Sequence, residues 1–271
     1  MDRLKCACVV LLSASFGAVP EAWAGTGTFS GGKYNFCVSV RFNATPAQLA
    51  NIRAAFTRGS QVLADATDGQ HRFGRIRLVN DSGGSQQAEY WVHPNAGRAV
   101  ATYGKYAVPG EHVNMYYPSN FTGKNGADGD AYTVAHEHAH HSWGVGDEYA
   151  GPDPTGRQKS IPAEDAPLAL QSPTLNYSLM DNYFTRGGRA AGGAYTLNEF
   201  CTAANHDPDH NTWQHSIKHQ SVWETIASHP SRAASMPAGL PVSAPPAPQA
   251  VDFGDGGGMR STVLLIDRSG S

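Results

Sequence analysis

The stretch HEHAHHSWGVGDEY, residues 136–149, decides which fold and which chemistry the chain is expected to have. His136 and His140 lie four residues apart, and on a helix this spacing puts both imidazoles on one face. Two histidines placed in this way can bind one zinc ion. Glu137 follows the first histidine and can act as the general base for a water at an open metal position. The alternative is a histidine-rich amphipathic helix, because H-E-x-x-H also occurs by chance.

The residues after His140 offer candidates for a third ligand. Gly144 lies four residues past His140, where a left-handed turn that ends the helix is sterically cheap, and Gly146 adds further freedom. Asp147 then lies seven residues past His140, and a carboxylate oxygen is an accepted zinc ligand. The spacing and the glycine favour Asp147. The alternative third ligands are Glu148, Glu164 and Glu199.

The N-terminus has the form of a signal peptide. A basic start, MDRLK, is followed by an apolar core over residues 6–19 and by the small-x-small sequence Ala22-Trp23-Ala24. We expect cleavage after Ala24, so that residues 1–24 are removed and the mature chain is secreted, extracellular or periplasmic. A buried N-terminal strand is the alternative interpretation.

Charge and hydropathy exclude two kinds of partner from the expected function. The formal net charge is −3, and no run of charge is long enough to indicate a nucleic-acid surface. No apolar run after the signal approaches the roughly 20 residues that span a bilayer, so we expect no membrane span.

The cysteines of the mature chain are Cys37 and Cys201, since Cys6 and Cys8 leave with the signal. Two cysteines in an oxidising compartment suggest one disulfide, which would close a long loop. Two separate buried thiols remain the alternative.

Strands interleave with helices along the chain, and this order predicts an α/β domain over residues 25–229. One helix is expected to begin with Thr45 as its N-cap and Pro46 in its first turn. A second is expected to be capped by Asp128 or Asp130 and to break at Gly144. The expected strands are residues 34–42, 71–81, 88–94 and 112–117, and the expected helices are residues 45–67, 128–143 and 210–229.

The composition changes after about residue 230. Residues 230–259 are rich in proline and glycine and predict a linker. Residues 260–271, which include the apolar run STVLLIDRSGS, are expected to begin a further domain.

Residues 136–149 resemble the metalloprotease motif of the calcium-activated chloride channel regulator family, which is H-E-x-A-H-x-x-W-G-V-x-D-E-Y. The matching residues are His136, Glu137, Ala139, His140, Trp143, Gly144, Val145, Asp147, Glu148 and Tyr149. The segment EFCTAANHDPDHNTWQHSIKHQSVWETI, residues 199–226, is similar to a later part of that family. NYSLMDNYF, residues 176–184, looks like the family's methionine turn. LLIDRSGS, residues 264–271, looks like the first strand of its von Willebrand factor type A domain.

The resemblance implies a metzincin-like zincin domain with a twisted mixed sheet and an active-site helix. It implies a zinc peptidase with His136, His140 and Asp147 as ligands and Glu137 as base, and it places Met180 beneath the metal. It also implies cleavage of the protein's own chain. The family has further cysteines around Cys201 that are absent here, so its disulfide pattern does not transfer.

The resemblance further implies a truncated type A domain over residues 260–271. Asp267, Ser269 and Ser271 would form part of its D-x-S-x-S site for Mg²⁺ or Ca²⁺. That site needs further oxygen ligands from later loops. A protein ligand of such a domain is an expected partner.

The function that we expect is an exported zinc endopeptidase, in which water activated by zinc attacks a peptide carbonyl and Glu137 takes its proton. The substrate is a protein or peptide, including the chain itself. Tyr149 and Tyr177 are both candidates to assist the oxyanion. The rival interpretation is an adhesion protein with a structural zinc, in which the type A domain does the binding.

Overall fold

A computed structural model describes residues 27–81, 85–123, 127–148, 178–180, 199–203, 206, 212–238 and 250–255. The expected signal peptide lies outside these residues, and so does the expected type A segment with Asp267, Ser269 and Ser271. Glu164, Tyr149 and Tyr177 also lie outside the described residues.

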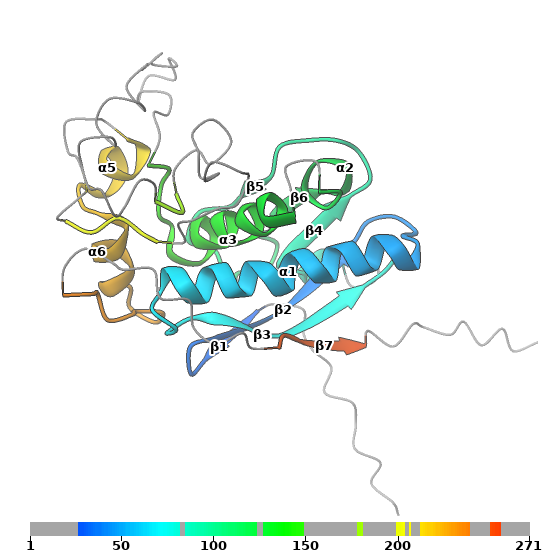
Figure 1. Ribbon diagram of the computed structural model, residues 1–271, viewed down its shortest axis with the longest axis horizontal. Helices are drawn as coiled ribbons and strands as arrows, with labels where there is room; N and C mark the ends of the chain where they lie inside the picture. Colours follow the sequence, from blue (N-terminus) through cyan, green and yellow to red (C-terminus); the bar gives the residue numbers. More distant parts are fainter. Residues whose placement is uncertain are drawn as a thin grey trace, which may run out of the picture.

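A mixed sheet forms the centre of the described part, which is therefore α/β (Figure 1). The strands are β1 Thr28–Ser30, β2 Lys33–Val40, β3 Arg72–Val79, β4 Tyr90–His93, β5 Val100–Ala101, β6 Val113–Tyr116 and β7 Asp252–Asp255. Their order is β5-β6-β4-β2-β3-β7, with β1 paired to the start of β2. The neighbours β6-β4-β2-β3-β7 are parallel, whereas β5 and β1 pair antiparallel. The short antiparallel strand β5 is therefore the outer edge on one side.

Strand β7 lies within residues 230–259, where the sequence predicted a linker. It pairs parallel to β3 and places Phe253 opposite Ile76. Phe253 is partly buried against the core. Residues 252–255 therefore belong to the sheet of the preceding domain. The linker predicted over residues 230–259 does not include them.

Helix α1, Pro46–Ala66, confirms the N-terminal signals in the sequence. The Thr45 side chain accepts from the backbone N–H of Gln48, and the Gln48 side chain accepts from the backbone N–H of Thr45. This capping box, with Pro46 in the first turn, fixes where the helix begins. Phe56 then packs on the sheet, with its ring centroid 5.9 Å from that of Phe36 and 4.9 Å from that of Tyr90.

Helix α3, Ala127–Trp143, carries the histidine motif and ends at Gly144, as predicted. It begins at Ala127, so Asp128 and Asp130 lie in its first turn and neither is the N-cap that the sequence predicted. Asp130 instead accepts from the backbone N–H of Gly123, at 2.8 Å. Two short elements remain: η1 Ser85–Gln87 lies between β3 and β4, and α2 Tyr117–Asn120 lies between β6 and α3.

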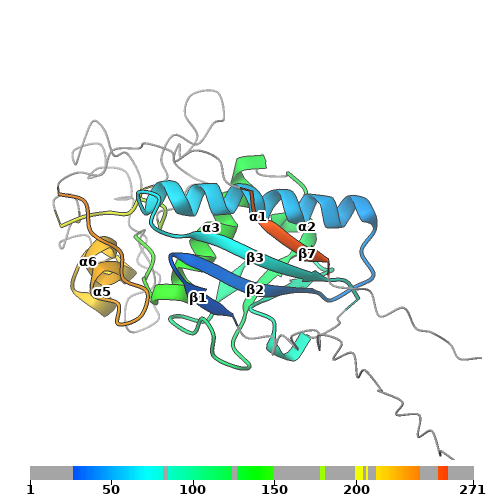
Figure 2. The same cartoon turned by 90° about the horizontal axis from the view of Figure 1, so that it is seen from below.

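Helices α1 and α3 cover the same face of the sheet, which Figures 1 and 2 show from two sides. Residues alternate along a strand, so Phe36 of β2 points toward these helices while its neighbour Cys37 points to the opposite face. The side chain of His138 of α3 enters the core between α3 and the sheet. Its ring lies 6.0 Å from Phe36 and 4.8 Å from Phe73 between centroids, and its Nδ1 lies 2.9 Å from the Tyr90 hydroxyl.

The helix predicted over residues 210–229 is two helices, α5 Trp213–Lys218 and α6 Val222–Ala227. His219 adopts a left-handed conformation with φ of 56° and ends α5. Ser221 caps α6 through a capping box with Glu224. The sequence interpretation missed this S-x-x-E signal, which begins a second helix where the apolar spacing alone suggests continuity.

The disulfide predicted between Cys37 and Cys201 is not formed, and both are buried free thiols. Cys37 lies on the face of β2 that points away from α1 and α3. Cys201 lies beside the start of α6, where its sulfur accepts from the backbone N–H of Val222 at 3.3 Å. The alternative of two separate buried thiols therefore describes the structure.

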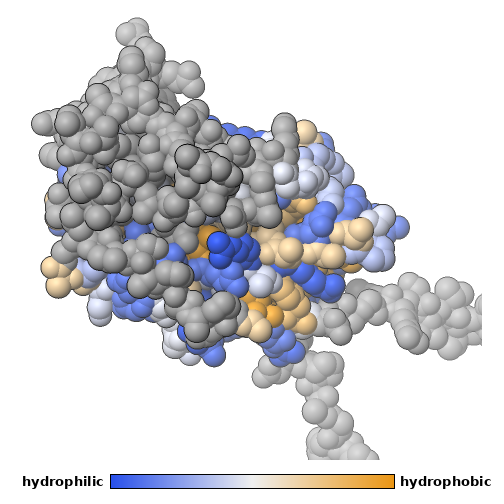
Figure 3. Space-filling model, viewed as in Figure 1, coloured by the Kyte–Doolittle hydropathy of each residue, from blue (hydrophilic) through white to orange (hydrophobic). Residues whose placement is uncertain are grey.

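On the surface, hydrophobic and hydrophilic side chains are interspersed over the described part of the face seen in Figure 3. Within the described ranges, the exposed large hydrophobic residues belong to separate segments and are Val100, Val108, Ile217 and Met236. Scattered residues of this kind are ordinary on a protein surface. Among the described helices, none is long and apolar enough to cross a membrane.

Candidate metal centre

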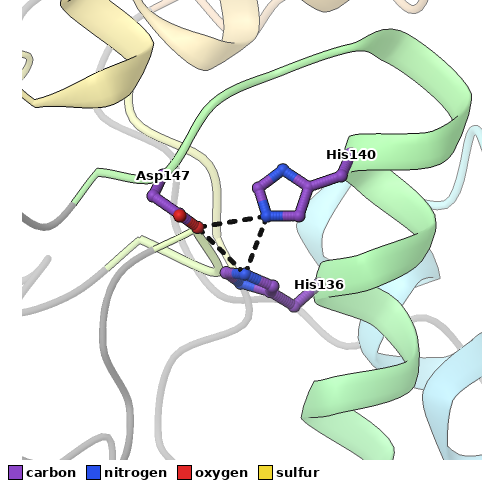
Figure 4. Close-up of side chains that lie close together, drawn as sticks. All are labelled: His136, His140 and Asp147. Atoms are coloured by element: carbon purple, nitrogen blue, oxygen red, sulfur yellow. Dashed lines mark hydrogen bonds and ion pairs between the residues drawn. The ribbon is translucent and has the colours of Figure 1, made fainter. Parts of the chain in front are cut away.

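Three side chains from the helix motif and the loop after it converge on one point (Figure 4). His136 Nε2 and His140 Nε2 lie 3.0 Å apart, and each is 3.1 Å from Oδ1 of Asp147. All three side chains are buried. The structure therefore brings together the pair of histidines and the carboxylate that the spacing favoured.

Both imidazoles are oriented by backbone carbonyls on their far side. Nδ1 of His136 lies 2.9 Å from the carbonyl oxygen of Leu179, and Nδ1 of His140 lies 2.7 Å from that of Val145. A carbonyl oxygen only accepts, so each Nδ1 donates its hydrogen outward. In a neutral imidazole the lone pair then lies on Nε2, and both lone pairs point toward Asp147.

The converging atoms require a positive charge between them. Oδ1 of Asp147 is buried without a hydrogen-bond donor in the described part of the chain. Two imidazole lone pairs and a carboxylate oxygen at about 3 Å would repel one another. A metal ion relieves this repulsion, and the carbonyls that hold each Nδ1 are the outer partners that metal-binding histidines ordinarily have.

The pKa values of His136 and Asp147 also indicate that this point favours positive charge. Burial by itself lowers the pKa of His136, but the Asp147 carboxylate beside its Nε2 outweighs burial, so the pKa is raised. Burial by itself raises the pKa of Asp147, but His136 and His140 outweigh it and hold that pKa well below its usual range. Asp147 is thus ionised, as a metal ligand must be.

A tight turn returns the chain from α3 to the site. Gly144 has φ of +65°, a conformation that glycine adopts at little cost. Gly146 lies so close to α5 that a Cβ there would be 2.7 Å from the backbone nitrogen of Gln214. Gln214 holds this loop by two hydrogen bonds. Its side-chain Oε1 accepts from the Gly146 N–H at 2.7 Å, and its backbone N–H donates to the Asp147 carbonyl at 2.9 Å.

Two further residues lie beside these three candidate ligands. Glu137 is buried next to His136, and its charge contributes to the raised pKa of that histidine. Tyr103, just after β5, lies with its ring 4.5 Å from His140 and 4.8 Å from Trp213 of α5, between centroids. Its ring therefore covers the candidate ligand His140, and the sequence interpretation did not identify Tyr103.

The turn of residues 178–180 lies against the same site. Leu179 accepts from His136, and the Met180 carbonyl accepts from the Glu148 N–H at 2.8 Å. Met180 is fully buried. The segment that resembles a methionine turn therefore contacts both the first histidine and the residue after Asp147.

The alternative third ligands that the structure describes lie elsewhere. Glu148 is grouped with Cys201 and His206, away from the histidine pair. Burial, with the charges of Asp65 and Asp68 at the end of α1, raises the pKa of Glu199 to about 8. Neither carboxylate is grouped with His136 and His140.

Sequence reasoning also missed the partners that hold α3 in place. Glu89 is buried before β4, and its Oε2 lies 2.7 Å from Nε2 of His141. The Nδ1 of His141 lies 2.9 Å from the Thr102 carbonyl oxygen. An isolated glutamate directly before a strand gives no local signal that it pairs with a histidine more than fifty residues later.

Scans against profiles of protein families, curated proteins and solved structures find no match to this chain.

Proposed function

We propose that this protein is a zinc-dependent endopeptidase with a metzincin-like domain. The observation that carries the proposal is the buried convergence of His136 Nε2, His140 Nε2 and Asp147 Oδ1 at 3.0–3.1 Å, with both Nδ1 atoms engaged by carbonyls. Three protein ligands with an open position are typical of catalytic zinc sites, whereas structural sites are closed by four.

The donor set fits zinc. Zinc accepts imidazole and carboxylate ligands at about 2.0–2.2 Å, which places tetrahedral ligand atoms about 3.3 Å apart. The observed separations are a few tenths of an ångström shorter, an adjustment within reach of side-chain rotation. Calcium and magnesium prefer all-oxygen sites, so two nitrogens argue against them. A zinc ion bound here supplies Lewis acidity, which activates water and polarises a peptide carbonyl.

Glu137 supplies the base. Glu137 is buried next to His136 in the sequence, and it is not one of the three candidate ligands. Its carboxylate accepts the proton of the attacking water and can return it to the leaving amine. Tyr149 and Tyr177 stay candidates for the oxyanion, and Tyr103 joins them because its ring packs on His140.

The edge strand β5 offers a place for the substrate backbone. β5 is outermost in the strand order, and Val100 is 54% exposed. An extended peptide can add to such an edge as a further strand. The chain passes directly from β5 to Thr102, which holds His141, and to Tyr103. A peptide paired with β5 would run toward the metal centre, which suits unfolded or extended protein substrates.

Export, self-cleavage and a type A binding domain complete the proposal, and they rest on the sequence. The signal peptide implies secretion. The expected self-cleavage site lies between residues 230 and 258, and Asp267, Ser269 and Ser271 would hold Mg²⁺ or Ca²⁺ in a longer chain. The rival is an adhesion protein whose zinc is structural, with a protein ligand of the type A domain as its partner.

The deciding experiment compares wild type with Glu137→Gln, and Glu111→Gln serves as a control away from the site. Zinc content, circular dichroism and cleavage of an unfolded protein substrate are measured on each. We expect Glu137→Gln to keep zinc and fold yet to lose cleavage by about 10²–10⁴-fold, the usual worth of a general base. Glu111→Gln should retain wild-type activity.

Intact mass after incubation with and without a zinc chelator tests self-cleavage. We expect the wild-type chain to be cut and the chelated chain and Glu137→Gln to stay whole. A zinc-loaded wild type that is inert toward unfolded proteins and toward itself would favour the adhesion protein. A cut that persists in Glu137→Gln would belong to a contaminating protease.

A further inference from the structure

We propose that the chain holds a second zinc ion, bound by Cys201, His206 and Glu148. Cys201 Sγ and His206 Nδ1 come from one segment, five residues apart, and Glu148 Oε1 comes from a loop 53 residues before Cys201. Sγ lies 3.0 Å from Oε1 and 3.7 Å from Nδ1, and Nδ1 lies 3.4 Å from Oε1. None of these atoms belongs to the histidine pair of the first centre.

The separations match those of donors around a single ion. Zinc bonds are about 2.3 Å to thiolate and about 2.0–2.2 Å to imidazole and carboxylate, so tetrahedral ligand atoms lie about 3.3–3.6 Å apart. The three observed separations, 3.0–3.7 Å, bracket this range. A soft thiolate with imidazole selects zinc over magnesium or calcium. Binding replaces the thiol S–H bond by an S–metal bond and releases one proton to solvent.

Outer contacts are in place for two of the ligands. The backbone N–H of Val222, the first residue of α6, donates to the Cys201 sulfur at 3.3 Å. Such a hydrogen bond favours a sulfur that carries negative charge. Nε2 of His206 lies 3.1 Å from Nδ1 of His215 in α5, and a proton on this Nε2 leaves the lone pair of Nδ1 for the metal.

The second ion would fasten the loop that carries the first centre. Glu148 directly follows Asp147, so a ligand of each ion comes from adjacent residues. Helix α5 reaches both places, because Gln214 holds the loop at residues 146 and 147 while its neighbour His215 contacts His206. An ion at this site therefore joins two parts of the chain directly, the loop after α3 through Glu148 and the segment of Cys201 and His206. It also joins α5 indirectly, because His215 contacts His206. The ion would therefore position Asp147 through the loop.

The test is cobalt substitution, because sulfur bound to Co²⁺ gives a near-ultraviolet charge-transfer band that imidazole and carboxylate do not. The first centre contains no sulfur, so the band reports the second site alone. The full chain is used with Cys6→Ser and Cys8→Ser, which removes the N-terminal thiols. We expect two bound Co²⁺ per chain and a strong sulfur band.

Two cysteine variants in the same background locate the sulfur. Cys201→Ser should abolish the band and reduce bound Co²⁺ from two to one per chain. Cys37→Ser removes the other buried thiol and should leave both the band and the stoichiometry unchanged. His140→Ala should keep the band while losing the other ion, which separates this proposal from the first centre.

The parent chain alone can overturn the proposal, so it does not depend on whether Cys201→Ser folds. A saturated parent chain without a sulfur band excludes a thiolate ligand. A band that survives Cys201→Ser, or that disappears in Cys37→Ser, assigns the metal to other residues. Loss of the band in His140→Ala, with the fold intact by circular dichroism, would show that the two sites are not separate.

Discussion

The Nδ1 atom of His136 lies 2.9 Å from the carbonyl oxygen of Leu179, a residue 43 positions later in the sequence. This contact fixes which nitrogen of His136 faces the metal centre. The local motif supplies the ligand, but a separate turn, residues 178–180, sets its orientation. The same turn accepts from the N–H of Glu148, so it touches the chain on both sides of the site.

The first prediction concerns the third ligand. Asp147→Asn should remove one zinc equivalent relative to wild type, because a neutral amide oxygen replaces the carboxylate that faces both imidazoles. Loss of an outer partner alone typically costs 10–100-fold in affinity, so we expect weakening of at least about 100-fold. Zinc content by elemental mass spectrometry after dialysis measures it.

The control for this prediction is Asp252→Asn, which changes a carboxylate that is exposed in β7 and pairs with Arg75 on the surface. It should keep the wild-type zinc content. Undiminished zinc in Asp147→Asn would move the third ligand to another carboxylate, with Glu164 the remaining candidate that the structure does not describe.

The second prediction concerns the close approach of α5 to the loop. Gly146→Ala places a Cβ 2.7 Å from the backbone nitrogen of Gln214, so the loop or α5 must shift and Asp147 must move with it. We expect zinc affinity to fall about 10–100-fold, as for other outer-shell changes. Competition with a fluorescent zinc chelator gives the affinity.

Gly110→Ala is the matched control, since Gly110 has φ of +84° with open space around it. This change strains the backbone and lowers stability by about 1 kcal/mol, yet it should leave zinc affinity unchanged. Equal zinc affinity in both variants would mean that α5 does not position Asp147.

The elements that the sequence predicted correctly have local causes. Thr45, Pro46 and Gln48 specify the start of α1 within four residues, and the spacing of His136 and His140 requires only a helix. Gly144 ends that helix because its backbone adopts a positive φ. Signals of this kind involve neighbours along the chain and can be read without the fold.

The features that the sequence did not predict depend on distant partners. Glu89 with His141, Leu179 with His136 and the pairing of β7 with β3 join residues separated by more than forty positions. The failed disulfide has the same origin, because which face of β2 carries Cys37 depends on how the strand packs. Periodicity along the chain does not encode which partner a residue meets.

The third prediction concerns acid stability. Burial, with nearby Arg232, lowers the pKa of His71 from its ordinary value of 6.5 to about 4. Between these values the unfolded chain binds more protons than the native one, so native stability falls as the pH drops from 6.5 to 4. One such histidine contributes a slope of up to about 1.4 kcal/mol per pH unit.

His71→Gln removes the titrating group. The slope of the unfolding free energy against pH should therefore fall by up to about 1.4 kcal/mol per pH unit, the contribution of one proton. Urea unfolding between pH 4.5 and 7 measures it, and only the slope counts, since the variant also loses the contact of His71 with the Tyr34 hydroxyl. A slope equal to that of wild type would contradict the lowered pKa.

The fourth prediction concerns the ion pair that holds helix α3. Both neighbours of the His141 ring, the Thr102 carbonyl and the Glu89 carboxylate, only accept hydrogen bonds, so His141 donates from both nitrogens as an imidazolium. Glu89 also accepts at Oε1 from the backbone N–H groups of Gly27 and Ala107. The pair is therefore buried and charged, and it sits next to His140.

Glu89→Ala leaves this imidazolium and two N–H groups without an acceptor, and breaking a buried pair in this way costs about 3–5 kcal/mol. Urea unfolding should show that loss, whereas Glu111→Ala, at a partly exposed carboxylate, should change stability by less than about 0.5 kcal/mol. The double variant Glu89→Ala with His141→Leu should recover part of the loss, because it removes the unpaired charge. A cost below about 1 kcal/mol for Glu89→Ala, or no recovery in the double variant, would show that Glu89 and His141 are not an ion pair in solution.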